Sequence, residues 1–450
     1  MTKVITYGTY DVLHYGHIRL LERAKALGDY LIVGVTADDF DKSRGKINVQ
    51  QSLMERVEAV RATGIADEII IEEYEGQKID DIRRYDIDIF TVGSDWEGQF
   101  DYLNEYCKVV YLERTKGISS TDLRTQERKL RFGLVGSKNP VLKHIHESKY
   151  VNGICVSGVY TEDHDTRERL KKDSEVTLVN DYTELLDRCD ALYIASHPAQ
   201  HVAQIKEALL AGKHILCEAP LALKKEEAEY LYALAKEQGL VLIETVKTAY
   251  STAYNRLLLL VKSGKIGKIV SVDAVCTSLN WQDDSQIPDI ATNWNSICAW
   301  GPTALLPVFQ ILGTDYVKKN IVTRLVEKKS RFDAFTKIDF VYNQAAASIR
   351  VGKGVKSEGE LIISGTNGYV YVPAPWWKTD YFEIRYEDPN ENKRYFYQLD
   401  GEGIRYEIMS FCEAIQGVNS GRGMNHTVSV AISEVLEDYY DGKDVFELTV

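Results

Sequence analysis

The sequence places two histidines three residues apart where a strand gives way to a helix, within GTYDVLHYGH at residues 8–17. His14 and His17 begin that helix, so both imidazoles can face one point. Gly8 permits a tight turn, and Gly16 lets the backbone come close to a ligand. The N–H groups and positive end of the helix favour an anion, such as a phosphate whose charge rises in a transition state. Taken by themselves, the histidines fit a phosphate site no better than they fit a metal-binding pair or two surface side chains.

A second segment rich in hydrogen-bond donors follows about a hundred residues later, as RTKGISST at residues 114–121. It also lies between a strand and a helix. Arg114 can hold a phosphate with its forked guanidinium. Ser119 and Ser120 can cap the helix while its N–H groups turn toward the same anion. The chain therefore has two helix starts suited to anions.

These two segments together resemble the HxGH and RTxGISTT signatures of the nucleotidyltransferase superfamily, and of its glycerol-3-phosphate cytidylyltransferases in particular. The resemblance covers residues 1–128 nearly without gaps and includes LLERAKALGDYLIV, GSDWEG and VVYLERTKGIS. It implies an enzyme that uses CTP, accompanied by Mg²⁺, and glycerol 3-phosphate. The acceptor phosphate then attacks the α-phosphorus of CTP in line, and pyrophosphate leaves. Catalysis depends on positioning and charge stabilisation rather than on a protein nucleophile.

The resemblance assigns roles to individual residues. The matches to catalytic positions are His14, His17, Lys46 and Arg114. The matches to nucleotide-binding positions are Thr9, Tyr10, Asp11, Thr115, Gly117, Ile118, Ser119, Ser120 and Thr121. The matches to the acceptor side are Arg44, which is more often lysine, Lys78 and Asp95. Asp11 or Asp95 would organise Mg²⁺ or the ligand network, and no metal ligands are assigned. Without the resemblance, Lys46 and Lys78 would be ordinary solvated lysines.

Two positions depart from the glycerol-phosphate pattern. The chain has Gly93-Ser94-Asp95-Trp96 where the family often reads GDDW. It also has Gly64 where an arginine often precedes the VDEV-like segment, and its nearest arginine is Arg61. Both departures concern the acceptor rather than the nucleotide. Ribitol phosphate, ethanolamine phosphate and heptose phosphate therefore stay open as acceptors beside glycerol 3-phosphate.

Hydrophobic patterning predicts the elements that must position these residues. Short β-branched runs alternate with helical spacing over residues 1–128, which predicts a small doubly wound α/β domain. A second strand–helix series from residue 130 predicts a Rossmann-like, dinucleotide-binding-type domain over residues 129–250. Alternating stretches after about residue 265 and a helical tail predict an α+β domain with a largely antiparallel sheet over residues 251–450.

From residue 130 the order of elements resembles the Gfo/Idh/MocA oxidoreductases. The matching segments are ASHPAQH at 195–201, AGKHILCEAP at 211–220 and SGKIG at 263–267. The resemblance implies NAD(P) as a cofactor, with Gly133, Gly136 and Glu218 at its site. Lys247 ends the strand VLIETV at the carboxyl edge of the sheet, where such sites lie.

The catalytic positions of that family are nevertheless changed in this chain. The replaced positions are Lys138 for a glycine of the GxGxxG turn, Thr161 beside Glu162 for the ribose-binding acid, Ala219 for the lysine of Glu-Lys-Pro, and Ala299 with Thr303 for the Asp and His pair. Dehydrogenase catalysis does not follow from the fold alone. In one interpretation Lys247 replaces the missing lysine in a reductase that makes the polyol phosphate. In the other, Lys247 is a solvated lysine and the domain is an inactive binding or dimerisation module.

Composition limits the remaining choices. A net charge of −13 argues against nucleic-acid or membrane-surface partners, which need clustered cations. No segment reaches the roughly 20 apolar residues of a membrane helix. Seven scattered cysteines without a CxxC pair, and a start without a signal-peptide pattern, predict a cytoplasmic protein. We expect small-molecule substrates, a homodimer or higher homo-oligomer, and a role in teichoic-acid or capsule synthesis; the alternative is a nucleotide sensor with both sites inert.

Overall fold

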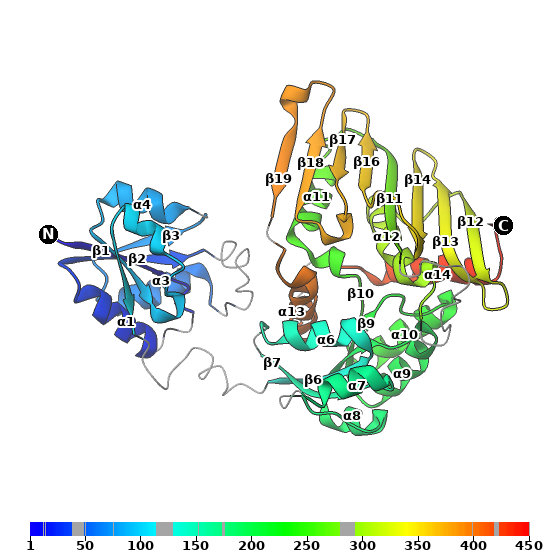
Figure 1. Ribbon diagram of the computed structural model, residues 1–450, viewed down its shortest axis with the longest axis horizontal. Coiled ribbons are helices and arrows are strands. Elements are labelled where there is room, and N and C mark those ends of the chain that lie inside the picture. Colours follow the sequence, from blue (N-terminus) through cyan, green and yellow to red (C-terminus); the bar gives the residue numbers. More distant parts are fainter. Residues whose placement is uncertain are drawn as a thin grey trace. The chain divides into compact units, whose positions relative to one another are not determined.

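The computed structural model consists of two compact units, a first unit of residues 1–129 and a second unit of residues 130–450 (Figure 1). The structure describes all residues except 12, 14, 38–48, 50, 75, 114–128, 152, 173–175, 280–292, 398, 418–422 and 450. Of Asp95 and Asp400 it describes only the backbone. Since residues 130–450 form one compact unit, the division at residue 250 stays a prediction.

The first unit is a parallel five-stranded sheet in the order β3-β2-β1-β4-β5. Its elements are β1 (Lys3–Gly8), α1 (Tyr15–Lys25), β2 (Tyr30–Thr36), α3 (Leu53–Ala62), β3 (Glu68–Glu72), α4 (Gln77–Tyr85), β4 (Ile89–Gly93), η1 (Ser94–Trp96), η2 (Asp101–Glu105) and β5 (Lys108–Leu112). The strand order reverses between β1 and β4. Ligands of such sheets bind outside the carboxyl ends of the strands at this reversal. The predicted doubly wound fold is confirmed, and the loop after β1 lies at its switch point.

The second unit begins with a Rossmann layer, a parallel sheet in the order β10-β9-β8-β6-β7. Its elements are β6 (Leu130–Gly136), α6 (Lys138–Ser148), β7 (Ile154–Tyr160), α7 (His164–Leu170), α8 (Tyr182–Arg188), β8 (Ala191–Ala195), α9 (Pro198–Leu210), β9 (His214–Glu218), α10 (Lys225–Glu237) and β10 (Leu242–Thr245). Here the order reverses between β6 and β8. The predicted Rossmann-like fold is confirmed.

The rest of the second unit is built around a mixed ten-stranded sheet, called here the large sheet. Most neighbours are antiparallel, whereas β11 pairs parallel with β14 and β12 pairs parallel with β20, which confirms the largely antiparallel prediction. Its elements are η3 (Lys247–Tyr250), α11 (Thr252–Lys262), β11 (Ile269–Leu279), α12 (Ser296–Leu312), β12 (Lys318–Glu327), β13 (Phe332–Val341), β14 (Ala346–Gly352), β15 (Gly354–Val355), β16 (Leu361–Gly365), β17 (Gly368–Val372), η4 (Trp376–Lys378), β18 (Tyr381–Arg385), η5 (Pro389–Glu391), β19 (Lys393–Phe396) and β20 (Val445–Glu447).

The last helices of the chain return to the Rossmann layer. They are α13 (Ile404–Ile415), preceded by η6 (Asp400–Gly403), and α14 (His426–Tyr440). Ile408 and Phe411 of α13 join the core that contains Phe132 and Tyr193, and Figure 1 shows α13 beside α6. Residues from the end of the chain therefore reach the carboxyl edge of the parallel sheet, where a site is expected.

Glu244 near the end of β10 makes a second link to the returning chain. Its side chain is buried, accepts the N–H of Leu221 at 2.9 Å and accepts the hydroxyl of Ser429 in α14. Burial raises the pKa of Glu244 from its ordinary 4.5 to about 7. Between these values the carboxyl is protonated in the folded chain and ionised in the unfolded chain.

The stability that Glu244 contributes is therefore complete below its unfolded pKa and is lost as the pH rises through about 7. We expect urea unfolding to show falling stability between about pH 5 and pH 8, with a smaller fall in Glu244→Gln. Part of the fall should persist, because burial also raises the pKa of Asp333 to about 6. Equal pH slopes for the two proteins would contradict this assignment.

Candidate functional site

The candidate site of the first unit begins where β1 ends. Tyr10 is buried and holds a left-handed backbone conformation, with φ of 53°. Its ring folds back over Gly8, where a Cβ atom would lie 3.0 Å from Tyr10 Cζ. The same ring meets the imidazole of His17 edge to face, with centroids 5.6 Å apart. The glycine and the turned tyrosine together fix where His17 lies on the first turn of α1.

Asp11 ties this turn to the segment before α3. Its side chain is buried, and Oδ1 accepts the N–H of Gln51 at 3.0 Å. Ser52 follows at once as the N-cap of α3 and forms a capping box with Glu55. The start of α3 is thus positioned against the loop that carries Thr9, Tyr10 and Asp11.

Arg56 is a positioning residue that the sequence did not reveal. Its side chain is fully buried, and Nη1 donates to the carbonyls of Thr9 at 2.7 Å and Thr36 at 2.8 Å. Nε donates to the carbonyl of Gln51 at 3.1 Å. One guanidinium therefore joins the chain after β1, the end of β2 and the approach to α3. Arg56 lies on the buried face of α3 beside Val57 and Val60, and no local sequence signal marks it as a buried arginine.

Lys78 on the first turn of α4 lies with a buried acid rather than in solvent. It pairs with Glu72, which is 1% exposed and also accepts the hydroxyl of Thr36 at 2.9 Å. The Lys78 ammonium lies 4.6 Å from the centroid of the Tyr7 ring. Tyr7 is held in turn by its hydroxyl, which donates to Asp81 at 2.9 Å. This lysine is fixed at the carboxyl ends of β2 and β3.

The structure brings together the predicted residues Thr9, Tyr10, Asp11 and His17, and it places Lys78 with Glu72. Asp95 belongs to η1, directly after β4. The predicted residues outside the described part are His14, Arg44, Lys46, Arg114, Thr115, Gly117, Ile118, Ser119, Ser120 and Thr121. Within the described part, no three His, Cys, Asp or Glu side chains form a group that could hold a metal ion. Mg²⁺ as the companion of CTP therefore stays a prediction.

The turn after β6 is the candidate dinucleotide site of the second unit. Gly136 has φ of +131°, and a Cβ atom there would lie 2.4 Å from the carbonyl oxygen of Ala195, so this glycine lets β6 and β8 approach closely. A Cβ atom on Gly133 would lie 3.0 Å from Cδ2 of Leu192, so this glycine leaves room for the leucine side chain. Lys138 keeps a left-handed φ of 58° where the family pattern has glycine, and its N–H donates to Thr166 at 2.8 Å. The left-handed turn is preserved, but the Lys138 N–H already donates to Thr166 rather than to a ligand.

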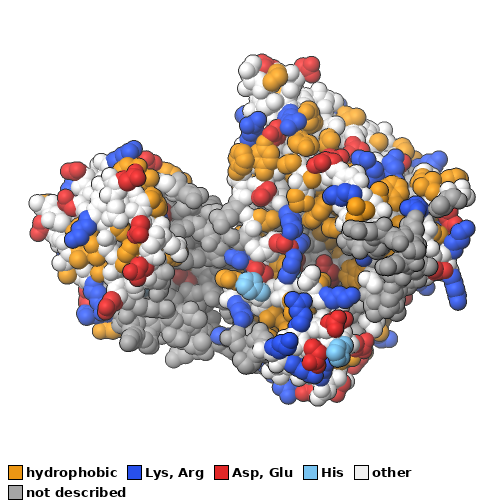
Figure 2. Space-filling view, in the orientation of Figure 1, with side chains coloured by type: hydrophobic (Ala, Val, Ile, Leu, Met, Phe, Trp, Pro, Cys, Tyr) orange, Lys and Arg blue, Asp and Glu red, His pale blue; other side chains and the backbone are white. Residues whose placement is uncertain are grey.

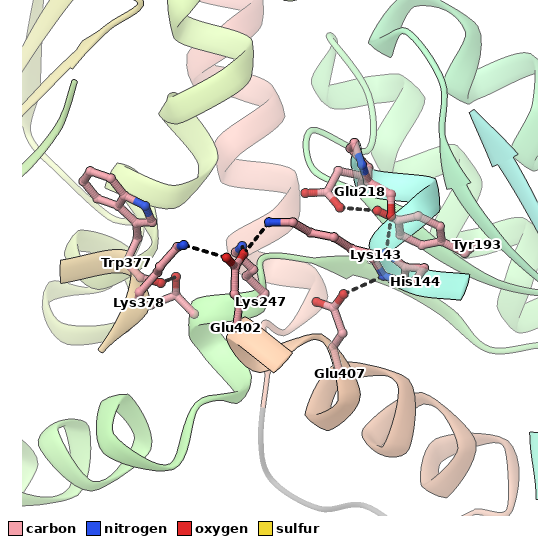
Figure 3. Close-up of polar contacts among 11 residues, drawn as sticks. Lys143, His144, Tyr193, Glu218, Lys247, Trp377, Lys378, Glu402 and Glu407 are labelled. Atoms are coloured by element: carbon pink, nitrogen blue, oxygen red, sulfur yellow. Dashed lines mark hydrogen bonds and ion pairs between the residues drawn. The ribbon is translucent and has the colours of Figure 1, made fainter. Parts of the chain in front are cut away.

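Five side chains form a polar network near the carboxyl ends of β8, β9 and β10 (Figure 3). The Tyr193 hydroxyl donates to Glu218 at 2.6 Å, and the Tyr193 ring stacks on His144 with centroids 3.5 Å apart. His144 Nε2 lies 2.8 Å from Glu407, which also accepts the Thr245 hydroxyl. Burial and the neighbouring carboxylate of Glu407 raise the pKa of Glu218.

Lys247 lies beside this network but is paired. Its ammonium lies 2.7 Å from Glu402, directly before α13. Lys143 and Lys378 contact the same carboxylate (Figure 3). In Figure 2, Lys and Arg side chains of the second unit lie among acidic ones around the junction of its two layers. Lys247 is therefore not an isolated solvated lysine, and its ammonium group contacts Glu402 rather than standing free in the site.

The two units of the chain resemble two different families of known proteins. Residues 5–126 match the cytidylyltransferase-like family. A glycerol-3-phosphate cytidylyltransferase of Bacillus spizizenii is 51% identical over 124 residues, which are 28% of this chain and 95% of that protein. The corresponding enzyme of Staphylococcus aureus is 47% identical over 130 residues, which cover 28% of this chain and 95% of that protein.

Residues 130–246 match the oxidoreductase family with an NAD-binding Rossmann fold. A dTDP-3,4-didehydro-2,6-dideoxy-α-D-glucose 3-reductase of Streptomyces antibioticus is 31% identical over 152 residues. These residues are 33% of this chain and 46%, or less than half, of that protein. A crystal structure of a 3-ketoreductase from Actinomadura kijaniata, with NADP and TDP-benzene, superposes with a TM-score of 0.61 over 71% of this chain and all of that one. At 19% identity, this likeness shows the fold alone. No helix in the described ranges is both long and apolar enough to cross a membrane.

We expect Arg56→Ala to lower the free energy of unfolding of the first unit by about 3–5 kcal/mol, because three carbonyls, two of them in buried hydrogen bonds, lose a charged donor. Arg61→Ala, on the same helix with 59% of its side chain exposed, is the matched control and should change stability by less than about 0.5 kcal/mol. Thermal unfolding of both variants checks this. Equal stability in the two would show that Arg56 does not hold the site together.

Proposed function

The chain belongs to the cytidylyltransferase-like family through its first unit and carries a Gfo/Idh/MocA oxidoreductase domain behind it, and we propose that it makes CDP-glycerol. In this reaction glycerol 3-phosphate attacks the α-phosphorus of CTP, a phosphorus–oxygen bond forms, and pyrophosphate leaves. The similarity over nearly the whole length of glycerol-3-phosphate cytidylyltransferases carries this proposal.

The geometry of the first unit supports the same reaction. The Gly8–Tyr10 turn lies at the switch point of the sheet and holds His17 at the start of α1, where the helix dipole favours phosphate. Lys78 supplies a fixed positive charge at the same sheet edge. His17 would donate to phosphate oxygens as their charge rises. Lys78 would attract the acceptor phosphate from its place beside Glu72.

We expect His17→Ala to keep the fold and to lower turnover by about 10²–10³-fold, the usual effect of removing one donor to a transition-state oxyanion. Pyrophosphate release from CTP with glycerol 3-phosphate measures this, and thermal unfolding controls for the fold. A near-wild-type rate would exclude His17 from the machinery. A panel of ribitol, ethanolamine and heptose phosphates in the same assay would show whether another acceptor is preferred.

For the second unit we propose binding of NAD(P)H and reduction of a carbonyl precursor to the polyol phosphate. The turn at Gly136, the start of α6 and the charge of Lys138 would hold the dinucleotide. Reduction needs a hydride, which the bound cofactor supplies, and a proton for the new hydroxyl. Glu218 is the candidate proton donor, because its raised pKa keeps a proton on it to higher pH. We also propose a cytoplasmic homo-oligomer that serves a bacterial surface polymer.

We expect NADPH or NADH to bind the full chain and Lys138→Glu to weaken that binding by about tenfold or more, since it reverses a charge beside the pyrophosphate. Lys149→Glu at the other end of α6 is the control and should leave the affinity unchanged. Fluorescence titration with each dinucleotide measures both effects. If neither dinucleotide binds, the alternative of an inactive binding or dimerisation module is favoured.

A further inference from the structure

Three lysines from distant parts of the chain converge on one carboxylate in the second unit (Figure 3). Lys143 of α6 and Lys247 of η3 each lie 2.7 Å from Glu402 Oε2, and Lys378 of η4 lies 2.6 Å from Glu402 Oε1. We call these three side chains the lysine triangle. Their exposed fractions of 46%, 29% and 40% show that solvent, and therefore a ligand, can reach them.

The carboxylate of Glu402 lies on a short backbone segment with unusual conformations. Gly401, Glu402 and Gly403 all have left-handed conformations, with φ of 56°, 55° and 92°. A Cβ atom on Gly401 would lie 1.9 Å from a carboxylate oxygen of Glu147, and one on Gly403 would lie 3.0 Å from the carbonyl of Lys247. A non-glycine residue in this region costs about 1 kcal/mol or more. The segment therefore holds Glu402 among the lysines at an energetic cost.

One carboxylate does not balance the lysine triangle. Three ammonium groups and one glutamate leave two positive charges concentrated in a small volume, and the lysines repel one another. A purely structural ion pair would be satisfied by one lysine. The positive charge of Lys247 also reaches Glu218, so the triangle lies close to the carboxyl end of β9 and to the candidate proton donor.

We propose that the lysine triangle binds the terminal phosphate of a small phosphomonoester and that Glu402 occupies this position when the ligand is absent. A terminal phosphate has three free oxygens, one for each ammonium, whereas a carboxylate has two that must be shared. Its two negative charges also match the excess of the lysine triangle. Because the backbone around Glu402 is fixed by its neighbours, the exchange needs only rotation of the glutamate side chain.

Binding at this position does not depend on the proposed reduction, but its use in catalysis does. A phosphate anchored on the lysine triangle would leave the rest of the molecule near Glu218, where a carbonyl would receive its proton. The ligand class is the same as that of the acceptor in the first unit. Both units would then handle a small phosphorylated polyol or its carbonyl precursor.

Isothermal titration of the full chain with inorganic phosphate, glycerol 3-phosphate and neutral glycerol tests the proposal. We expect Lys378→Gln to weaken binding of glycerol 3-phosphate at the second unit by at least about tenfold. Glu402→Gln should tighten it by about tenfold, because the internal competitor loses its charge. Lys337→Gln on the large sheet, where Lys337 pairs with Asp339, is the control and should bind as the wild type does. The first unit contributes equally to every variant.

Unchanged binding in both Lys378→Gln and Glu402→Gln would overturn the proposal and make the lysine triangle a structural cluster. Tighter binding of CDP-glycerol than of glycerol 3-phosphate, lost in Lys378→Gln, would overturn the terminal-phosphate assignment in favour of a diphosphate. The rate of cytidylyl transfer in the same preparations should stay at the wild-type level, which shows that the first unit is folded, and thermal unfolding checks that the second unit is folded. Failure of transfer with phosphate binding intact would count against the proposed function alone.

Discussion

Holding anions at the carboxyl edge of a parallel sheet needs positive charge, and that charge must be neutralised before the ligand arrives. This constraint shapes both units. In the first, Lys78 is kept beside Tyr7 by the buried carboxylate of Glu72. In the second, Glu402 neutralises part of the lysine triangle. An isolated lysine at either place would repel nearby cations or would need to be desolvated without a partner.

The two arrangements differ in how readily the internal acid can leave. Glu72 is 1% exposed and also holds Thr36, so its pairing with Lys78 is part of the packed structure. Glu402 is 30% exposed, and the three contacts that keep its pKa low, against the effect of partial burial, come from half-exposed lysines. A side chain of this kind can exchange with an incoming anion, whereas removal of Glu72 would leave a buried cation without its counter-ion.

The fold of both units could be predicted from the sequence because strand and helix periods are local properties. The HxGH turn was equally readable, since its residues follow one another, and the structure shows why Gly8 and Tyr10 belong together. Arg56 could not be predicted, because nothing local distinguishes an arginine buried on three carbonyls from a solvated one. The pairing of Lys78 with Glu72 could not be predicted either, since nothing in the sequence shows that the end of β3 and the start of α4 bring these two side chains together.

The second unit shows the same limit over longer distances. The substitution of Ala219 for the family lysine was visible in the sequence, but what replaces it depends on residues 407 and 402, which follow after about two hundred positions. The return of α13 to the Rossmann layer brings them there. Lys247 is engaged by Glu402, and Glu218 is the acid whose environment favours a retained proton. In our proposal the lysine triangle binds the phosphate and Glu218 delivers the proton, although Ala219 stands in place of the family lysine.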